Sequence, residues 1–384
     1  MSRLAPPASP GTLLDGYSLV ARRDDQGLGE VWLGERPHAP DDRAVVKFIA
    51  PAPPGSATAP REFDERVKQL ARVTSPNLAG VRRGGVHEGW LFTLNEFIEA
   101  RTLESWLAGH REARTLPPPG VALWVFDAIC GALQGAHRQG LAHGALSPRS
   151  VLLRLLAPGT YHTWVLDLGL SPWLREASEV SEVENVSPRY LAPEQGSAAA
   201  PTPRSDVFAL GVLLVELLTL TTTPGGNPRE PIARYVQRDF GSLTGALQKL
   251  REDIHEDFWF TVSEALDPDA AQRPENAQQL KTRVRAAARN AALWRDAPEP
   301  APEPPMPRER RETATESSPA ARGRDAVAPE GWQHSERMLV DDAIRALARD
   351  SVRGRKQSVA PPVTPAPVAV VTAPVAPPVA PVLP

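Results

Sequence analysis

The sequence predicts an α+β protein in which a small strand-rich part is followed by a larger helical part. Between Tyr17 and Ala100, short segments such as EVWLGE and AVVKFI alternate apolar and polar residues, and this period of two is typical of strands. From Leu103 to Ala288 the apolar residues follow the period of a helix instead. With 384 residues, 41% of them hydrophobic, the chain can bury a large core.

Three segments carry the clearest helical patterns. One lies near Arg61–Val73, within the strand-rich part, and in a second the apolar residues from Val121 to Ala136 form one stripe at a spacing of about 3.6 residues. The third, VFALGVLLVELLTL at residues 207–220, is apolar on nearly every face. Because it is too short to span a bilayer, we expect a helix buried inside the core.

The distribution of proline divides the chain. In chain order we expect a flexible N-terminus at residues 1–16, a folded domain at 17–286, a disordered Pro/Ala/Glu/Arg linker at 287–330, a short amphipathic helix within 331–356 and a Pro/Ala/Val-rich tail at 357–384. The tail is uncharged, but its prolines exclude a transmembrane helix and favour polyproline II. Two roles are open for it, a spacer and a ligand for a proline-binding groove.

Charge and cysteine content restrict the partners and the compartment. The net charge of −3 gives no electrostatic reason to expect nucleic acid as a partner. A single cysteine, Cys130, excludes a disulfide framework and fits a reducing cytoplasm. The first residues hold no apolar run of a secretion signal. We therefore expect a cytoplasmic protein without a membrane span.

Seven fragments occur in an order that points to one family. They are GLGEVWLGE at 27–35, AVVKFI at 44–49, HGALSPRSVLL at 143–153, LDLGL at 166–170, SPRYLAPEQ at 187–195, RSDVFALGVLLVELL at 204–218 and QRPENAQQL at 272–280. Together they resemble the signature motifs of protein kinases, in particular the bacterial Ser/Thr kinases. The resemblance implies a two-lobed kinase-like fold with a small β-rich N-lobe and a larger helical C-lobe, and it does not reach residues 291–384.

The resemblance implies a nucleotide-binding region in which the phosphate contacts are altered. Its residues are Gly29 of the glycine-rich loop, Lys47 for the phosphates, Val31, Val45 and Leu152 around the adenine, and Glu96 and Phe97 of the hinge. Asp24 and Gln26 replace the first two glycines, and an aspartate there repels phosphate. Arg66 stands where the family has the glutamate that pairs with Lys47, with Glu65 beside it. We expect weak binding of ATP or ADP.

The catalytic loop departs furthest from the family pattern. Ala145 occupies the position of the aspartate that accepts the substrate proton, and no carboxylate occurs between His143 and Ser150. Ser150 replaces the metal-binding asparagine, and Gly144 replaces an arginine. Ser147 replaces the lysine that contacts the γ-phosphate. The resemblance leaves Asp167 as a metal ligand, for which we expect weak Mg²⁺ binding and only with nucleotide.

The positions that hold the family fold together are kept. Through the resemblance, Glu194 and Arg273 form an ion pair, Asp206 binds the backbone of the catalytic loop, and His143 and Leu168 join Leu70 in a stack between the lobes. These are structural roles, so they support the fold and not activity. A kept scaffold around an altered catalytic loop is typical of a pseudokinase.

Between Gly169 and Ala192 an acidic segment carries four glutamates, Glu176, Glu179, Glu182 and Glu184. One interpretation is a solvated loop, and the other is a negative docking surface that mimics a phosphorylated loop.

The sequence thus predicts a pseudokinase that acts as a signalling or regulatory binding module for protein partners. Two alternatives stay open. One is an active, unconventional Ser/Thr kinase in which Glu65 and distant carboxylates replace the missing groups. The other is a scaffold that acts mainly through its proline-rich tail.

Overall fold

The structure is a computed structural model that describes residues 5–23, 27–52, 58–180, 186–197, 199–221, 254 and 256–290. All of these lie in the first of two units into which the chain divides, Met1–Gln333. The first four residues of the predicted linker, 287–290, belong instead to helix α9 (Ala277–Asn290). The rest of that linker, the predicted helix at 331–356 and the proline-rich tail lie outside the described residues, as do Asp24 and Gln26. The predictions made for them stay predictions.

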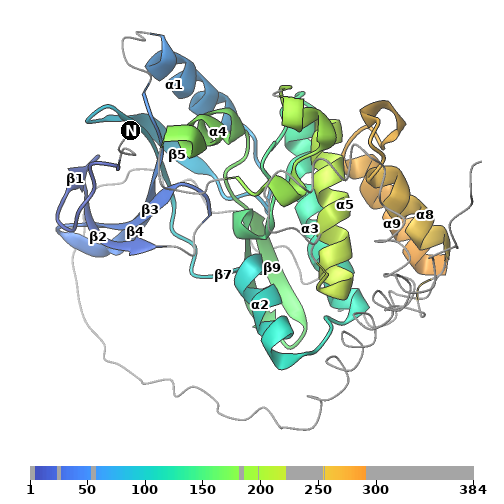
Figure 1. Cartoon of the computed structure of the whole chain (residues 1–384). Coiled ribbons are helices and arrows are strands. Elements are labelled where there is room, and N and C mark those ends of the chain that lie inside the picture. The colour runs from blue at the N-terminus through green and yellow to red at the C-terminus, as the bar shows by residue number, and fades with distance from the viewer. Residues whose placement is uncertain are drawn as a thin grey trace, which may run out of the picture. The chain divides into compact units, whose positions relative to one another are not determined.

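Six antiparallel strands build the N-terminal lobe, drawn in blue and cyan in Figure 1. They are β1 (Leu13–Leu14), β2 (Tyr17–Arg23), β3 (Glu30–Arg36), β4 (Ala39–Pro51), β5 (Val81–His87) and β6 (Trp90–Glu96), in the order β1-β2-β3-β4-β6-β5. Helix α1 (Ala59–Leu70) packs on β5, where Gly84 leaves room for the side chains of Phe63 and Val67. The strand-rich part and its one helix are as predicted.

The two faces of this sheet differ in chemistry. One face joins a closed apolar cluster that includes Trp32, Val46 and Leu94. Side chains alternate along a strand, and residues paired across two strands share a face. The register of the strands therefore identifies the residues on the opposite face. It carries Val31, Leu33, Val45, Lys47, Thr93 and Asn95. This second face carries the residues of the candidate site.

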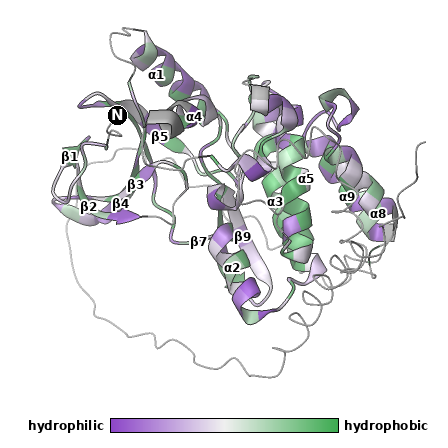
Figure 2. Cartoon of the chain, in the orientation of Figure 1, coloured by the Kyte–Doolittle hydropathy of each residue, from purple (hydrophilic) through white to green (hydrophobic). Residues whose placement is uncertain are grey.

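Five longer helices build most of the C-terminal lobe: α2 (Leu103–Ala113), α3 (Pro119–His137), α5 (Pro203–Thr219), α8 (Glu256–Ala265) and α9 (Ala277–Asn290). Figure 2 shows α3 and α5 as the most apolar helices of this lobe. Every residue of α5 from Ser205 to Thr219 is buried, which confirms the predicted core helix. Within the described residues, α3 alone is long and apolar enough to cross a membrane, and 61% of its apolar window is buried inside the protein.

Two parts of the sequence interpretation are wrong. The region after Leu103 is not helical throughout, because β7 (Arg101–Thr102), β8 (Val151–Ala157) and β9 (Thr160–Val165) form a three-stranded sheet. The segment after Gly169, expected as a loop, begins with helix α4 (Ser171–Val180). Short 3-10 helices at Pro148–Ser150, Pro188–Tyr190, Pro193–Ser197 and Ala270–Gln272 complete the elements. The α+β class and the two lobes are confirmed.

Candidate functional site

The two lobes meet at a buried ion pair. Lys47 Nζ on β4 lies 2.5 Å from Asp167 Oδ1, and each side chain is 2% exposed. The second carboxylate oxygen, Oδ2, accepts a hydrogen bond of 2.8 Å from the backbone N–H of Leu28. Both oxygens of Asp167 are therefore engaged by groups of the chain itself, and we call Lys47, Asp167 and the Leu28 N–H the clasp.

The loop before β3 covers the clasp because Gly27 has no side chain. Its φ is +101°, and a Cβ there would lie 2.5 Å from Lys47 Nζ and closer still to Asp167 Oδ2. The next residue, Leu28, is buried in the main hydrophobic core. Gly29, at φ +90°, approaches the Phe48 carbonyl so closely that a Cβ would lie 2.7 Å from its oxygen. The loop backbone thus occupies the space beside the ammonium and the carboxylate.

Helix α1 supplies no carboxylate to Lys47. Within the described part of the chain, the ion-pair partner of Lys47 is Asp167, while Glu65 is exposed and Arg66 is partly buried. Helix α4 contacts β4, and its Trp173 meets Phe63 of α1 edge-on at 5.3 Å between ring centroids. In Figure 1 α4 lies beside α1 and β5. Helix α4 thus packs against α1 and β4, and among the described residues no carboxylate of α1 pairs with Lys47.

Asp206 at the start of α5 holds the catalytic loop. Its carboxylate accepts hydrogen bonds from the backbone N–H of His143 (2.7 Å) and of Gly144 (2.8 Å). It also accepts from His137 Nε2 at 2.8 Å. The N–H of Ala277 donates to His137 Nδ1, so the ring proton belongs on Nε2. Two loop N–H groups and one histidine of α3 share this buried carboxylate, which fixes the loop to the helical lobe.

His143 is a structural member of this loop. Its Nε2 donates to the Leu166 carbonyl at 2.8 Å, and its Nδ1 accepts from the Ala145 N–H at 3.3 Å. Burial lowers the pKa of His143, which keeps the ring neutral. Leu70 and Leu168, expected beside it, are buried members of the main hydrophobic core, and Leu70 also packs against Gly169.

Ala145 and Ser150 are the other loop positions at which the sequence departs from the family pattern. Ala145 is buried, and its methyl group cannot take a proton. Ser150 Oγ donates to the Ser147 carbonyl at 2.9 Å and accepts from the Ser147 N–H at 3.0 Å. The described residues contain no group of three potential metal-ligating side chains. The Ser150 hydroxyl thus serves the turn in which it lies.

Gly144 has no space for the arginine that it replaces. At φ +75°, a Cβ would lie 2.7 Å from Pro201 Cβ and closer still to Ser171 Oγ. The Gly144 carbonyl accepts a 2.8 Å hydrogen bond from the buried side chain of Gln195. Pro201, Ser171 and Gln195 therefore fill the space around Gly144, and a larger residue would require them to move.

The residues expected around an adenine fall into three groups. Val31 and Val45 are buried on the sheet face that carries Lys47. Leu152 forms a small buried cluster with Ile98 and Leu166. At the end of β6, Glu96 is exposed, while Phe97 is partly buried beneath the guanidinium of Arg43, 4.5 Å from the ring centroid.

Asn95, which the sequence analysis did not single out, also belongs to this region. It is 8% exposed and lies opposite Val45 in the β4–β6 ladder. The signal in the sequence is an amide inside the strand WLFTLNE, whose first six residues are all buried. A buried polar side chain in an apolar strand indicates a specific role for its hydrogen bonds.

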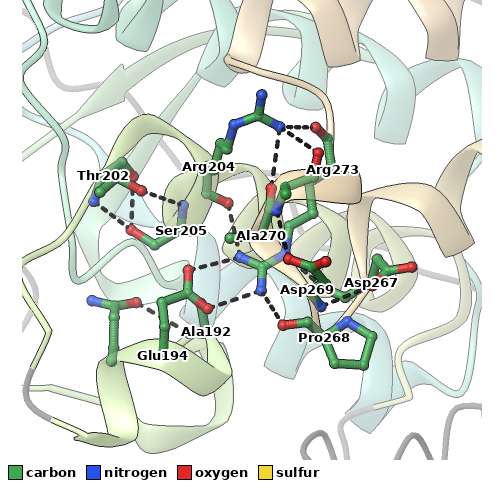
Figure 3. Close-up of polar contacts among 12 residues, drawn as sticks. Ala192, Glu194, Thr202, Arg204, Ser205, Asp267, Pro268, Asp269, Ala270 and Arg273 are labelled. Atoms are coloured by element: carbon green, nitrogen blue, oxygen red, sulfur yellow. Dashed lines mark hydrogen bonds and ion pairs between the residues drawn. The ribbon is translucent and has the colours of Figure 1, made fainter.

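The scaffold residues of the C-terminal lobe come together in Figure 3. Arg273 Nη1 and Nη2 each lie 2.9 Å from one oxygen of Glu194, a two-pronged ion pair in which the arginine side chain is fully buried. The guanidinium also donates to the backbone carbonyls of Asp267, Pro268 and Arg204. This pair ties the segment after α4 to the loop before α9.

The acidic segment is described only in part. Glu176 and Glu179 lie on α4, while Glu182 and Glu184 lie outside the described residues. The docking surface predicted for these glutamates therefore stays a prediction.

Comparisons with known proteins identify the family. Residues 26–281 match the family model for protein tyrosine and serine/threonine kinases. The chain is 24% identical over 273 residues to a probable serine/threonine-protein kinase, PknB, from Lactococcus lactis, which covers 70% of this chain and 42% of that protein. It is 25% identical over 243 residues to the serine/threonine-protein kinase PknI of Mycobacterium tuberculosis, covering 62% of this chain and 39% of that protein.

Solved structures give the same fold. The Mycobacterium tuberculosis PknI kinase domain matches with a TM-score of 0.55 and 22% identity, over 73% of this chain and 100% of that chain. The structure of Rad53 1–466 in complex with AMP-PNP matches with a TM-score of 0.54 and 16% identity, over 70% of this chain and 65% of that chain. The chain spans less than half the length of the two curated relatives given above.

Proposed function

Since the chain belongs to the protein tyrosine and serine/threonine kinase family, we propose that it is a family member without phosphotransfer activity that acts as a regulatory binding module. Its partner in this proposal is a protein, and its compartment is the cytoplasm. The kinase activities named for its relatives belong to those proteins, which extend well beyond the region that this chain matches.

The catalytic loop is the observation that carries this proposal. In phosphoryl transfer to a protein, a base accepts the hydroxyl proton and metal ions neutralise the phosphates. A buried methyl group, Ala145, stands at the base position. The Ser150 hydroxyl at the metal position is engaged twice by Ser147. Because both hydrogen bonds lie within one buried turn, a nucleotide would have to open that turn to gain a ligand.

The residues present do not fit a magnesium–nucleotide complex. Mg²⁺ takes oxygen ligands, and the carboxylate that would supply them is Asp167. Its oxygens are bound to Lys47 and to the Leu28 N–H, and the Gly27 backbone lies against the same pair. Binding of Mg²⁺ and phosphates therefore requires the clasp to open, and the cost of opening lowers their affinity.

A phosphotransfer assay tests the proposal. The full chain is incubated with radiolabelled ATP, Mg²⁺ and protein substrates, and incorporated phosphate is measured after gel separation. We expect no incorporation above a heat-denatured control. We also expect none with Ala145→Asp, because the added carboxylate restores neither the metal ligand at Ser150 nor free oxygens on Asp167.

Autophosphorylation by the unaltered chain that disappears in Asp167→Asn would contradict the proposal. Circular dichroism of Asp167→Asn shows whether that variant is folded, so that lost activity and lost structure are told apart. This outcome would favour the active-kinase alternative.

A further inference from the structure

The tip of the β8–β9 hairpin, residues 155–158, exposes apolar side chains one after another. Leu155 is 58% exposed and Leu156 is 51% exposed, and the alanine and proline that follow are exposed as well. The register of the two strands shifts between Leu155 and Ala157, so Leu156 has no residue opposite it. Four consecutive exposed apolar residues are avoided in soluble domains unless they serve a function. The tip is therefore a candidate docking surface.

The backbone of β8 is open at Leu155. Across the hairpin, the Tyr161 carbonyl accepts a hydrogen bond of 3.0 Å from Trp124 Nε1 on α3, so this carbonyl faces away from β8. Residues paired in an antiparallel ladder either both face each other or both face away. Leu155 pairs with Tyr161 and therefore directs its N–H and C=O away from β9, to what we call the outer edge of β8. The Tyr161 hydroxyl also accepts from Trp106 Nε1 at 3.1 Å, which holds the hairpin in place.

Strand β7 covers only the first part of the outer edge. Arg101 pairs with Leu153 and Thr102 pairs with Leu152, which leaves no residue of β7 opposite Leu155. Among the described residues, the N–H and C=O of Leu155 have no hydrogen-bond partner. An apolar edge with unpaired backbone groups is a template on which a further strand can form. Addition of an extended segment to such an edge is a recurring mode of peptide recognition.

The charges beside the tip set the chemistry of such a segment. Residues 151–165 contain Arg154 and neither Asp nor Glu, and Arg101 is exposed on β7. These two arginines outnumber Glu99, the one carboxylate of residues 97–102, whose backbone carbonyl accepts from Arg154 Nε at 2.9 Å. The surface is thus apolar at the two leucines and positive beside them. A segment with aliphatic residues and a neighbouring carboxylate complements it.

We propose that the outer edge of β8 binds an extended segment of a protein partner. The segment lies in line with β7 and exchanges backbone hydrogen bonds with Leu155. Its aliphatic residues cover Leu155 and Leu156, and an Asp or Glu of the segment meets Arg101 or Arg154. Because the hairpin is already formed, little ordering of this chain is needed for binding. The inference rests on the proposed function, since it names the surface by which the module holds its partner.

Selection of peptides from a phage-displayed random library on the immobilised full chain tests this surface. The selected peptides are synthesised with a fluorescent label, and their affinities for the chain in solution are measured by fluorescence anisotropy. We expect sequences rich in aliphatic and β-branched residues that carry at least one Asp or Glu. Their binding should weaken as the salt concentration is raised from about 50 to 300 mM, because added salt screens the arginines.

Leu155→Pro tests the backbone contact. Proline removes the N–H that faces outward and leaves the β8–β9 hydrogen bonds in place, which is how an edge strand accommodates proline. We expect the affinity to fall at least about tenfold in Leu155→Pro and in Leu156→Ser. In Leu155→Val, which keeps the N–H and an apolar side chain, it should fall by less than about threefold.

Leu13→Ser is the matched control. Leu13 is 65% exposed on β1 of the N-terminal lobe, so this variant removes a similarly exposed leucine elsewhere and should leave the affinities unchanged. Thermal melts establish that the variants are folded. If Leu155→Pro does not fold, Leu156→Ser decides, because it changes an exposed side chain and leaves the backbone N–H groups as they are.

Selected peptides that bind Leu155→Pro and Leu156→Ser as tightly as the unaltered chain would overturn the inference. So would selected peptides without acidic residues, or a selection that enriches no peptide over the bare support. Sedimentation equilibrium should show a monomer, and a dimer that Leu155→Pro breaks would place a second copy on the edge and likewise overturn it. These outcomes leave the phosphotransfer assay untouched. Conversely, phosphate transfer by the chain would refute the proposed function while the docking surface still stands.

Discussion

Lys47 and Asp167, 120 residues apart in sequence, neutralise each other in a buried pair that is closed by the N–H of Leu28. The charges that the family resemblance assigns to phosphate and metal are thereby satisfied within the chain. A ligand that needs either charge competes with an intramolecular partner that is already in place. The pairing therefore weakens the phosphate site, and loss of either partner alone would leave the other charge buried and unpaired.

The stability of the clasp is tested by a double-mutant cycle. Lys47→Met and Asp167→Asn each leave one polar group buried without its partner, and we expect each to lower the free energy of unfolding by about 3–5 kcal/mol. Asparagine is chosen because it tolerates the left-handed backbone of Asp167, φ +60°. The double variant should regain part of that loss, measured by urea unfolding. Single variants as stable as the unaltered chain would refute the pairing.

Alanine substitutions at two glycines in the catalytic-loop region distinguish the cost of steric crowding from the cost of backbone strain. Gly144 and Gly140 have nearly the same φ, +75° and +71°, but a Cβ at Gly140 meets nothing within 4 Å. Gly140→Ala should cost about 1 kcal/mol from strain alone. Gly144→Ala should cost at least about 2 kcal/mol more, because Pro201 and Ser171 would have to move. Equal losses in thermal or urea unfolding would show that the loop is open.

The buried His143 predicts how stability depends on pH. Its pKa is lowered in the folded chain, so below about pH 6.5 the unfolded state takes up a proton that the folded state refuses. Stability therefore falls as the pH falls from about 7 to 5. In His143→Gln the slope should be shallower by up to about 1.4 kcal/mol per pH unit. An unchanged slope in His143→Gln would contradict the neutral buried ring.

The spacing of apolar residues predicted those helices in which the apolar residues are also the buried ones. The core helix α5 is apolar on every side, and α3 keeps one continuous apolar stripe, so both patterns were unambiguous. The hairpin β8–β9 was missed because VLLRLLA does not alternate: its first three residues are buried, and the rest are exposed. Helix α4 was missed because the glutamates of this segment were interpreted as a solvated loop. The contact of Trp173 with Phe63 of α1 joins residues far apart in the sequence, so no local pattern indicates it.

The site was predictable residue by residue but not as an arrangement. Motif order placed Lys47, Ala145 and Asp167 in one region, because each sits in a short recognisable fragment. That Lys47 would pair with Asp167, and that Gly27 would lie against both, depends on how two lobes and a loop close together. Such contacts leave no local pattern in a sequence.

Calorimetric titration of the full chain with ATP, with and without Mg²⁺, tests most directly that the chain's own groups close the phosphate site. We predict a dissociation constant on the order of 0.1–1 mM that changes little with Mg²⁺, with ADP and adenosine binding about as well as ATP, because base contacts carry the affinity. Low-micromolar binding of ATP that requires Mg²⁺ and exceeds that of adenosine would contradict the account.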